Sequence, residues 1–373
     1  MPEIVGQLKV LCSLDWNSTS VDAEVELEHH DGCNIHLRIK PDTSVPITST
    51  DDCYITPLDG QEWQFSRSKI FISRIDNKST NGNLEQTISA QMPFVECKKS
   101  HSLTQSDNVA FCFSLTNFPT FIRINHPSIT LSGHNIVLQP VSFGQVNRIV
   151  FFEDIRYDQY GILKKLLDDF CWLTSFACGG LVSCSRIDIF HDDTPVEIHL
   201  YSPDTSLEPK SSVIHNRFDP DSIKNFMEGC YSQFQQNGDN YSIKGLIHLG
   251  ILAKHSPYVE TKVLLMSNFL EVLRYNYALN VGVPNGTFRQ ARDYFRWVAG
   301  SNAGNNASFK EIIEHFCSSI ALSGWSDDYK DLRNKIVHTG QIVGNDKYAR
   351  YTELHHFCDR IVMALLEYDS ITP

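Results

Sequence analysis

The spacing of apolar positions divides the chain into a first part with the period of strands and a second part with the period of helices. Through about residue 152, short runs rich in β-branched and aromatic residues are separated by turn-formers such as Asp31-Gly32. Many short strands at nearly regular spacing favour an antiparallel sandwich or a barrel-like sheet. The runs predict strands over Ile4–Leu11, Ala23–Glu28, Asn34–Ile39, Ile70–Ile75, Gln86–Met92, Val109–Leu115, Thr120–Ile124, Asn135–Leu138 and Arg148–Phe152.

The period changes to that of a helix over Tyr157–Cys178, and two further strand-like runs follow at Ser185–Phe190 and Val196–Tyr201. The next stretch, 202–218, is polar and carries two prolines, which is typical of a domain boundary. We therefore expect a β-rich domain over 1–155, a helix and hairpin over 156–205 that complete it, a linker over 206–218 and a helical bundle over 219–373.

The remainder of the chain has apolar residues three and four apart, as in helices that share a core. The strongly apolar segment 258–279 is expected to be the central member of the bundle. The pattern predicts helices over Asp221–Gln235, Ser242–Lys254, Tyr258–Leu279, Thr287–Ala299, Ser308–Leu322, Ser326–Thr339 and Lys347–Glu367. The expected fold class is α+β and multidomain, with a β-rich sandwich or barrel-like module followed by an all-α bundle.

One of these helices carries the residues best suited to chemistry, and both of its ends are marked: Ser326 can cap the start and Gly340 can end it. Asn334 and His338 are four apart and lie one turn from each other on the same side, whereas Arg333 lies about 140° around the axis from His338. Arginine can grip a phosphate with two donors, and histidine can move a proton near neutral pH. The alternative is a surface charge and a capping side chain without catalytic function.

An all-helical C-terminal domain with this set on its penultimate helix resembles the HEPN superfamily, whose ribonucleases share an Arg, a polar residue and, after three further residues, a His. The resemblance covers roughly residues 220–373, and the β-rich half in front is similar to the layout of ApeA-type phage-defence proteins. It implies RNA cleavage without a metal or cofactor, in a homodimer in which two motifs face one another. His338 would transfer a proton, Arg333 would stabilise charge on the phosphate, and Asn334 would orient the imidazole or contact the phosphate. The products would be a 2′,3′-cyclic phosphate and a 5′-hydroxyl end.

Further basic residues are candidates for RNA binding. Arg289, Arg292 and Arg296 recur at helical spacing among aromatic residues, so that charge for the backbone and rings for the bases are both at hand. Lys335 adds a charge inside the motif. A solvated helix face with buried aromatics is the alternative interpretation of the arginines. Glu271, a charge in the apolar central helix, is interpreted as partly exposed, with contact to the motif helix as the alternative.

Composition and charge narrow the class of protein. Hydrophobic residues make up 42% and charged residues 20% of the 373, which is ordinary for a soluble globular protein. The first 215 residues carry 27 acidic and 16 basic residues, against 17 and 16 in the remainder, so the N-terminal half is a poor partner for nucleic acid. The eleven cysteines form no CxxC pair or Cys/His cluster at metal spacing, which argues against a zinc site. The start of the chain has no basic segment followed by an apolar core, so we expect a cytoplasmic protein with reduced thiols and no membrane span.

The N-terminal half shows no GxSxG, P-loop, HExxH or dinucleotide-binding glycine pattern. Its histidines and acids are expected to lie on the surface. We therefore assign residues 1–215 to sensing or regulation, with a protein trigger or inhibitor as the partner. The expected function is an RNA-cleaving defence or toxin effector; the alternative is a non-catalytic bundle that binds RNA or nucleotide, or that only dimerises.

Overall fold

The computed structural model divides into two compact units. The first takes in Met1–Phe121, His126–Asp168 and Val182–Ser206, and the second takes in Ile122–Asn125, Asp169–Leu181 and Leu207–Pro373. The structure describes residues 7–30, 34–43, 45–48, 51–80, 83–99, 103–118, 128–143, 146–204, 206–209, 213–214, 222–292, 294–342 and 346–368.

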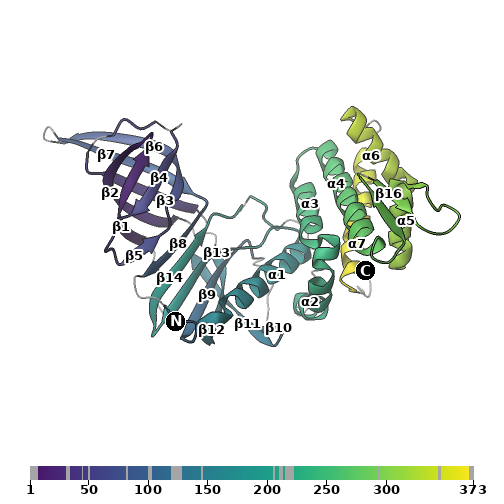
Figure 1. Ribbon diagram of the computed structural model, residues 1–373, viewed down its shortest axis with the longest axis horizontal. Coiled ribbons are helices and arrows are strands. Elements are labelled where there is room, and N and C mark those ends of the chain that lie inside the picture. The colour runs from purple at the N-terminus through teal and green to yellow at the C-terminus, as the bar shows by residue number, and fades with distance from the viewer. Residues whose placement is uncertain are drawn as a thin grey trace. The chain divides into compact units, whose positions relative to one another are not determined.

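The first unit begins with a closed six-stranded barrel in the order β1-β2-β3-β7-β6-β4, coloured purple to blue in Figure 1. Side chains alternate between its inside and outside: Val10 and Cys12 of β1 are buried, whereas Leu11 between them is 46% exposed. The sandwich or barrel-like module predicted from the strand spacing is confirmed. The barrel strands are β1 (Gln7–Trp16), β2 (Thr19–His30), β3 (Asn34–Pro41), β4 (Cys53–Pro57), β6 (Ser68–Thr80) and β7 (Asn83–Met92).

An eight-stranded antiparallel sheet forms the rest of this unit, in the order β10-β11-β12-β9-β13-β14-β8-β5. The first turn of helix α1 packs on it, because Tyr160 stacks on Phe111 of β9 with ring centroids 5.6 Å apart. The strand expected over Thr120–Ile124 lies outside the described residues. The sheet comprises β5 (Trp63–Phe65), β8 (Phe94–Lys99), β9 (Asn108–Thr116), β10 (Ser128–Leu131), β11 (His134–Phe143), β12 (Val146–Arg156), β13 (Ser183–His191) and β14 (Thr194–Tyr201), and α1 spans Tyr160–Cys178.

The second unit is built around α4, which contacts α2, α3, α5, α6 and α7. The central position expected for this helix is confirmed, since Val263, Leu270 and Leu273 are fully buried. Six of the seven predicted helices are observed, with ends within three residues of the expected ones, except that α2 continues six residues past Gln235. They are α2 (Ser222–Tyr241), α3 (Ile243–His255), α4 (Val259–Tyr277, continued by a π-turn over Ala278–Gly282), α5 (Phe309–Ser319), α6 (Asp327–Thr339) and α7 (Lys347–Leu365).

The seventh predicted helix, Thr287–Ala299, is wrong. This segment forms a hairpin of β15 (Phe288–Ala291) and β16 (Tyr294–Trp297), to which the short β17 (Asn306–Ala307) adds a third strand. Arg292 begins the reversal with a positive φ of 57°. The inward rings of Phe288 and Phe295 are buried against α4, so the packing of aromatic side chains decides in favour of strands.

Two general features concern the whole described chain. All ten cysteines in the described residues are free thiols, and nine of them are buried. In the same residues, every helix is too short or too polar to cross a membrane.

Candidate active site

The motif helix α6 is held in place by its ends and by its apolar side. Ser326 caps the start by accepting a hydrogen bond from the backbone N–H of Asp328, and Gly340 ends the helix with a left-handed φ of 66°. Leu332 and Ile336 are buried against the bundle. These contacts fix the helix rotation, and with it the direction of each polar side chain.

Arg333 lies at the border between the buried and exposed sides of α6. Its Nη2 forms an ion pair with Glu271 of α4, and its Nη1 donates a hydrogen bond of 2.9 Å to Oδ1 of Asn334. The guanidinium carbon lies 5.3 Å from the ring centre of Phe309. With 27% of its side chain exposed, Arg333 is restrained on several sides yet open to solvent.

Glu271 is the residue that orients this arginine. Its second oxygen accepts a hydrogen bond of 2.9 Å from Nε of Arg274, one turn along α4. Its side chain is 28% exposed, so it is partly exposed as expected, and it also makes the contact with the motif helix that was the alternative interpretation. Within the described residues the Nε of Arg333 is buried and has no hydrogen-bond partner.

His338 stands further around the exposed side of α6. At about 100° per residue, the order across this side is Arg333, Val337, Asn334, His338 and Lys335. His338 and Lys335 are exposed, and Asn334 is half-buried. No side chain among the described residues forms a hydrogen bond with the imidazole of His338. One helix therefore presents a restrained guanidinium and an unrestrained imidazole, with the amide of Asn334 between them.

The three arginines predicted to form a helical stripe lie on the hairpin instead. Arg289 and Arg296 are directly opposite each other across β15 and β16, and Arg292 is at the turn. Alternation along the strands places Tyr294 on the same outward side as this pair. Arg296 donates hydrogen bonds to the hydroxyl of Tyr294 at 2.9 Å and to Asn306 at 3.3 Å. Two like charges on facing positions repel each other, which favours an anion beside them.

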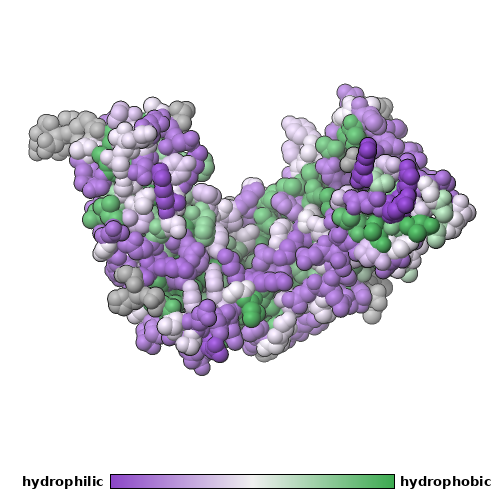
Figure 2. Space-filling view, in the orientation of Figure 1, coloured by the Kyte–Doolittle hydropathy of each residue, from purple (hydrophilic) through white to green (hydrophobic). Residues whose placement is uncertain are grey.

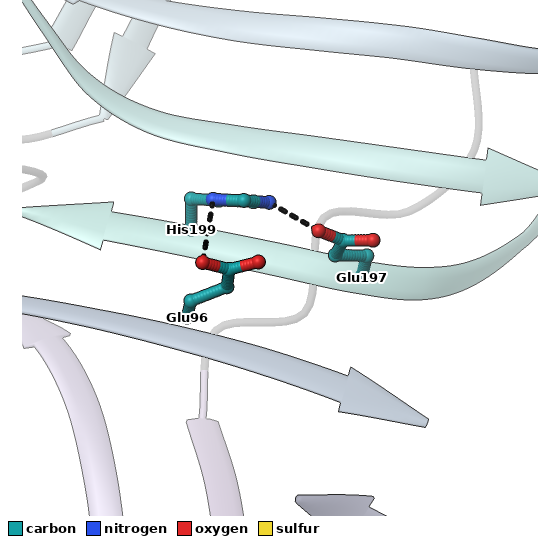
Figure 3. A group of neighbouring side chains, drawn as sticks. All are labelled: Glu96, Glu197 and His199. Atoms are coloured by element: carbon teal, nitrogen blue, oxygen red, sulfur yellow. Dashed lines mark hydrogen bonds and ion pairs between the residues drawn. The ribbon is translucent and has the colours of Figure 1, made fainter. Parts of the chain in front are cut away.

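A buried polar cluster in the first unit was not foreseen from the sequence (Figure 3). Glu197 and His199 of β14 are 3% and 2% exposed, so the expectation that acids and histidines of this half lie on the surface is wrong for them. Nε2 of His199 lies 2.6 Å from Glu197, and its Nδ1 lies 3.9 Å from Glu96 on β8. The alternation of polar and apolar residues over Val196–Leu200 predicts a strand. It fits a strand whose polar side faces solvent equally well, so it does not reveal that Glu197 and His199 are buried.

The charged and polar groups of this cluster satisfy one another by hydrogen bonds and ion pairs. Burial by itself raises the pKa of Glu197, but hydrogen bonds from His199 and Tyr157 outweigh it and lower the pKa to about 2. The ammonium of Lys98 lies 2.8 Å from Glu96 and 3.2 Å from Glu197.

These three residues could in principle hold a metal ion, since their ligand atoms lie within 4.8 Å of one another. The donor set does not fit a single ion as it stands. The imidazole turns a different nitrogen toward each glutamate (Figure 3). The ammonium of Lys98 already bridges the two carboxylates. The cluster therefore joins β8, β14 and the segment before α1.

Comparisons of the chain with protein-family models, with curated proteins and with solved structures found no match.

Proposed function

We propose that this protein is an endoribonuclease of HEPN type that cleaves RNA without a metal ion and acts as a defence or toxin effector. The observation that carries the proposal is the restrained Arg333, held by Glu271 and Asn334 on the same helix as the exposed His338. A cation positioned for a phosphate beside a group that can transfer a proton is the minimum set for cleavage by the 2′-hydroxyl of RNA.

The chemistry follows from these groups. An imidazole removes the proton of the 2′-hydroxyl, and the 2′-oxygen forms a bond to phosphorus. The bond from phosphorus to the 5′-oxygen then breaks, and a protonated imidazole returns a proton to the leaving oxygen. Arg333 stabilises the charge on the non-bridging oxygens. The products are a 2′,3′-cyclic phosphate and a 5′-hydroxyl end.

Acid and base require two imidazoles or one that acts twice, and a second copy of α6 supplies the second. Exposed apolar side chains on the face of the motif support a homodimer through the bundle. Val337, one turn after Arg333, is 50% exposed, and Leu264 and Tyr275, on the α4 side that bears Glu271, are 38% and 42% exposed. Figure 2 shows hydrophobic and hydrophilic side chains interspersed over the helical unit around α6 and β16.

Binding of the RNA strand is assigned to Lys335 and to the arginines of the hairpin, Arg289, Arg292 and Arg296. The outward guanidiniums contact phosphates, and the ring of Tyr294, which is 37% exposed, offers a surface on which a base can stack. The first unit, whose net charge is acidic, is proposed to sense a protein trigger or to restrain the nuclease.

A second candidate function is a bundle that binds RNA without cutting it. The absence of an orienting hydrogen bond to His338 among the described residues favours this candidate, because a general base is normally held in one orientation.

The test is incubation of the purified full-length protein with single-stranded RNA in excess EDTA. We expect products with 2′,3′-cyclic phosphate ends, and no cleavage of the same strand with 2′-deoxy sugars. His338→Ala should lower the rate about 10²–10⁴-fold, whereas His191→Ala, which removes a 40% exposed histidine of the first unit, should not change it. Cleavage that requires a divalent metal, or full activity of His338→Ala, would contradict the mechanism. RNA binding without cleavage would support the second candidate.

A further inference from the structure

A second arginine lies beside Arg333, and the proposed mechanism does not use it. Nε of Arg274 donates a hydrogen bond of 2.9 Å to one carboxylate oxygen of Glu271, and Nη2 of Arg333 pairs with the other oxygen. The two guanidiniums therefore flank one carboxylate, although Arg274 belongs to α4 and Arg333 to α6. The sequence analysis did not single out Arg274, because this arrangement depends on how α6 packs on α4.

The net charge at this point depends on Arg274. Glu271 carries one negative charge and Arg333 one positive charge, so these two residues by themselves form a neutral pair that attracts a phosphate weakly. Arg274 brings a second positive charge to the same carboxylate, which leaves one positive charge in excess over the three groups. A phosphodiester carries one negative charge, so it complements the three groups together but not the pair alone.

Arg274 also has donors that the fold does not use. Its two terminal nitrogens form no hydrogen bond with the described residues and, unlike Nε of Arg333, are not buried. The side chain is 20% exposed, against 27% for Arg333, so both arginines are restrained by Glu271 and partly exposed. A guanidinium held in this way loses little conformational freedom when it binds a phosphate.

The position of Arg274 connects the motif with the basic hairpin. Tyr275, the next residue of α4, packs against Phe295 of β16 with ring centroids 5.8 Å apart. Glu271, which pairs with Arg333, lies one turn before Tyr275 on the same helix. Arg274 is thus placed along α4 between the two surfaces to which RNA phosphates are assigned.

We propose that Arg274 is a second phosphate-binding residue of this site, which contacts the RNA backbone next to the phosphate held by Arg333. This inference rests on the proposed function, because it concerns the same site. It explains how a site whose motif arginine is already paired with an acid retains the positive charge to bind RNA. The alternative is an ion pair within α4 that only orients Glu271, in which case Arg274 contacts no substrate.

The test measures the binding of a strand that the proposed nuclease does not cut. A single-stranded oligonucleotide with 2′-deoxy sugars lacks the nucleophile, and its affinity for the full-length protein is measured by fluorescence anisotropy at several NaCl concentrations. Each phosphate contact contributes about −0.7 to the slope of log K against log salt for a single strand. Arg274→Gln should therefore make the slope shallower by about 0.7. It should also weaken binding about tenfold at low salt and raise KM for RNA.

Two further variants serve as controls. Lys224→Gln removes a cation of α2 that is 31% exposed and lies 3.9 Å from Glu228, one turn along its helix, and it should leave the slope unchanged. Arg274→Lys keeps the positive charge, so it should retain the slope of the wild type. A slope reduced equally in Arg274→Lys and Arg274→Gln would overturn the proposal, because the loss would then follow from a changed fold rather than from the missing charge.

Three other results would also overturn the proposal. They are an unchanged slope in Arg274→Gln, an equal reduction in Lys224→Gln, and no binding of the strand by the wild type. A lower kcat of Arg274→Gln with unchanged KM and slope belongs to the first of these, and would show that Arg274 only orients Glu271. Failure of the proposed function is a separate result. A wild type that binds the strand but does not cleave RNA in EDTA would refute the nuclease, and the slope of Arg274→Gln would still confirm or overturn the phosphate contact.

Discussion

Glu271 offers the sharpest test of how Arg333 is positioned. Glu271→Gln keeps the shape of the side chain but removes the charge that holds two arginines. Exposed ion pairs contribute about 0–1 kcal/mol and buried hydrogen bonds to charged groups about 1.5–3 kcal/mol. The side chains of Arg333, Glu271 and Arg274 are 27%, 28% and 20% exposed, so these ion pairs are intermediate between the exposed and the buried case. We therefore expect the free energy of unfolding of the helical unit to fall by about 1–2 kcal/mol.

The catalytic effect should be separable from this loss of stability. A guanidinium that is no longer fixed lowers kcat by about tenfold to a hundredfold, because small errors in position are costly in the transition state. KM for RNA should stay the same or fall, since a negative charge near the substrate phosphate has been removed.

The assay measures kcat and KM of cleavage in EDTA, with urea unfolding of the same samples. Glu260→Gln is the matched control, because Glu260 is also on α4, is 32% exposed and pairs with Lys347 at 2.9 Å, away from the motif. Equal kcat in Glu271→Gln and Glu260→Gln would refute the positioning role of Glu271.

Three further outcomes are expected. Arg289→Gln should keep or raise the melting temperature, because it relieves repulsion from the facing Arg296. The same change should weaken RNA binding and make the affinity less dependent on salt concentration. A lower melting temperature with unchanged RNA affinity would contradict this. Val337→Glu places a charge on the proposed dimer face. Sedimentation should therefore give the mass of a monomer for this variant and of a dimer for the wild type. A wild type that is monomeric at high concentration would count against that face. Because the folded pKa of Glu197 is depressed to about 2, its contribution to stability is complete above the unfolded pKa of about 4.3 and is lost as the pH falls through the folded pKa. Wild type and Glu197→Gln should therefore differ in stability at neutral pH and converge between about pH 4.5 and 2, and a constant difference would argue against the depressed pKa.

Local signals in the sequence were sufficient for α6. Ser326, Gly340 and the apolar Leu332 and Ile336 set its start, its end and its buried side, all within one segment of chain. For the same reason the order of Arg333, Asn334 and His338 around the helix could be derived from spacing. The catalytic role of these residues remains a prediction.

The hairpin shows where local signals fail. Phe288, Ala291, Phe295 and Val298 recur at helical spacing, yet the segment forms strands. The rings of Phe288 and Phe295 pack against tyrosines of α4, and Phe288 also packs against His315 of α5, residues that are distant in sequence. Packing of this kind outweighs a helix preference that amounts to less than about 1 kcal/mol per residue.

The spacing of apolar residues and the signals at helix ends, which act within a few residues, thus determined seven helices, most strands and the division into a β-rich and a helical half. Only the tertiary structure decided the closure of the barrel, the strand form of the basic hairpin and the contact of Glu271 with Arg333. It also decided the burial of Glu197 and His199. Each of these depends on which distant segments pack together, because burial and pairing arise from contacts across the fold that spacing along the chain does not encode.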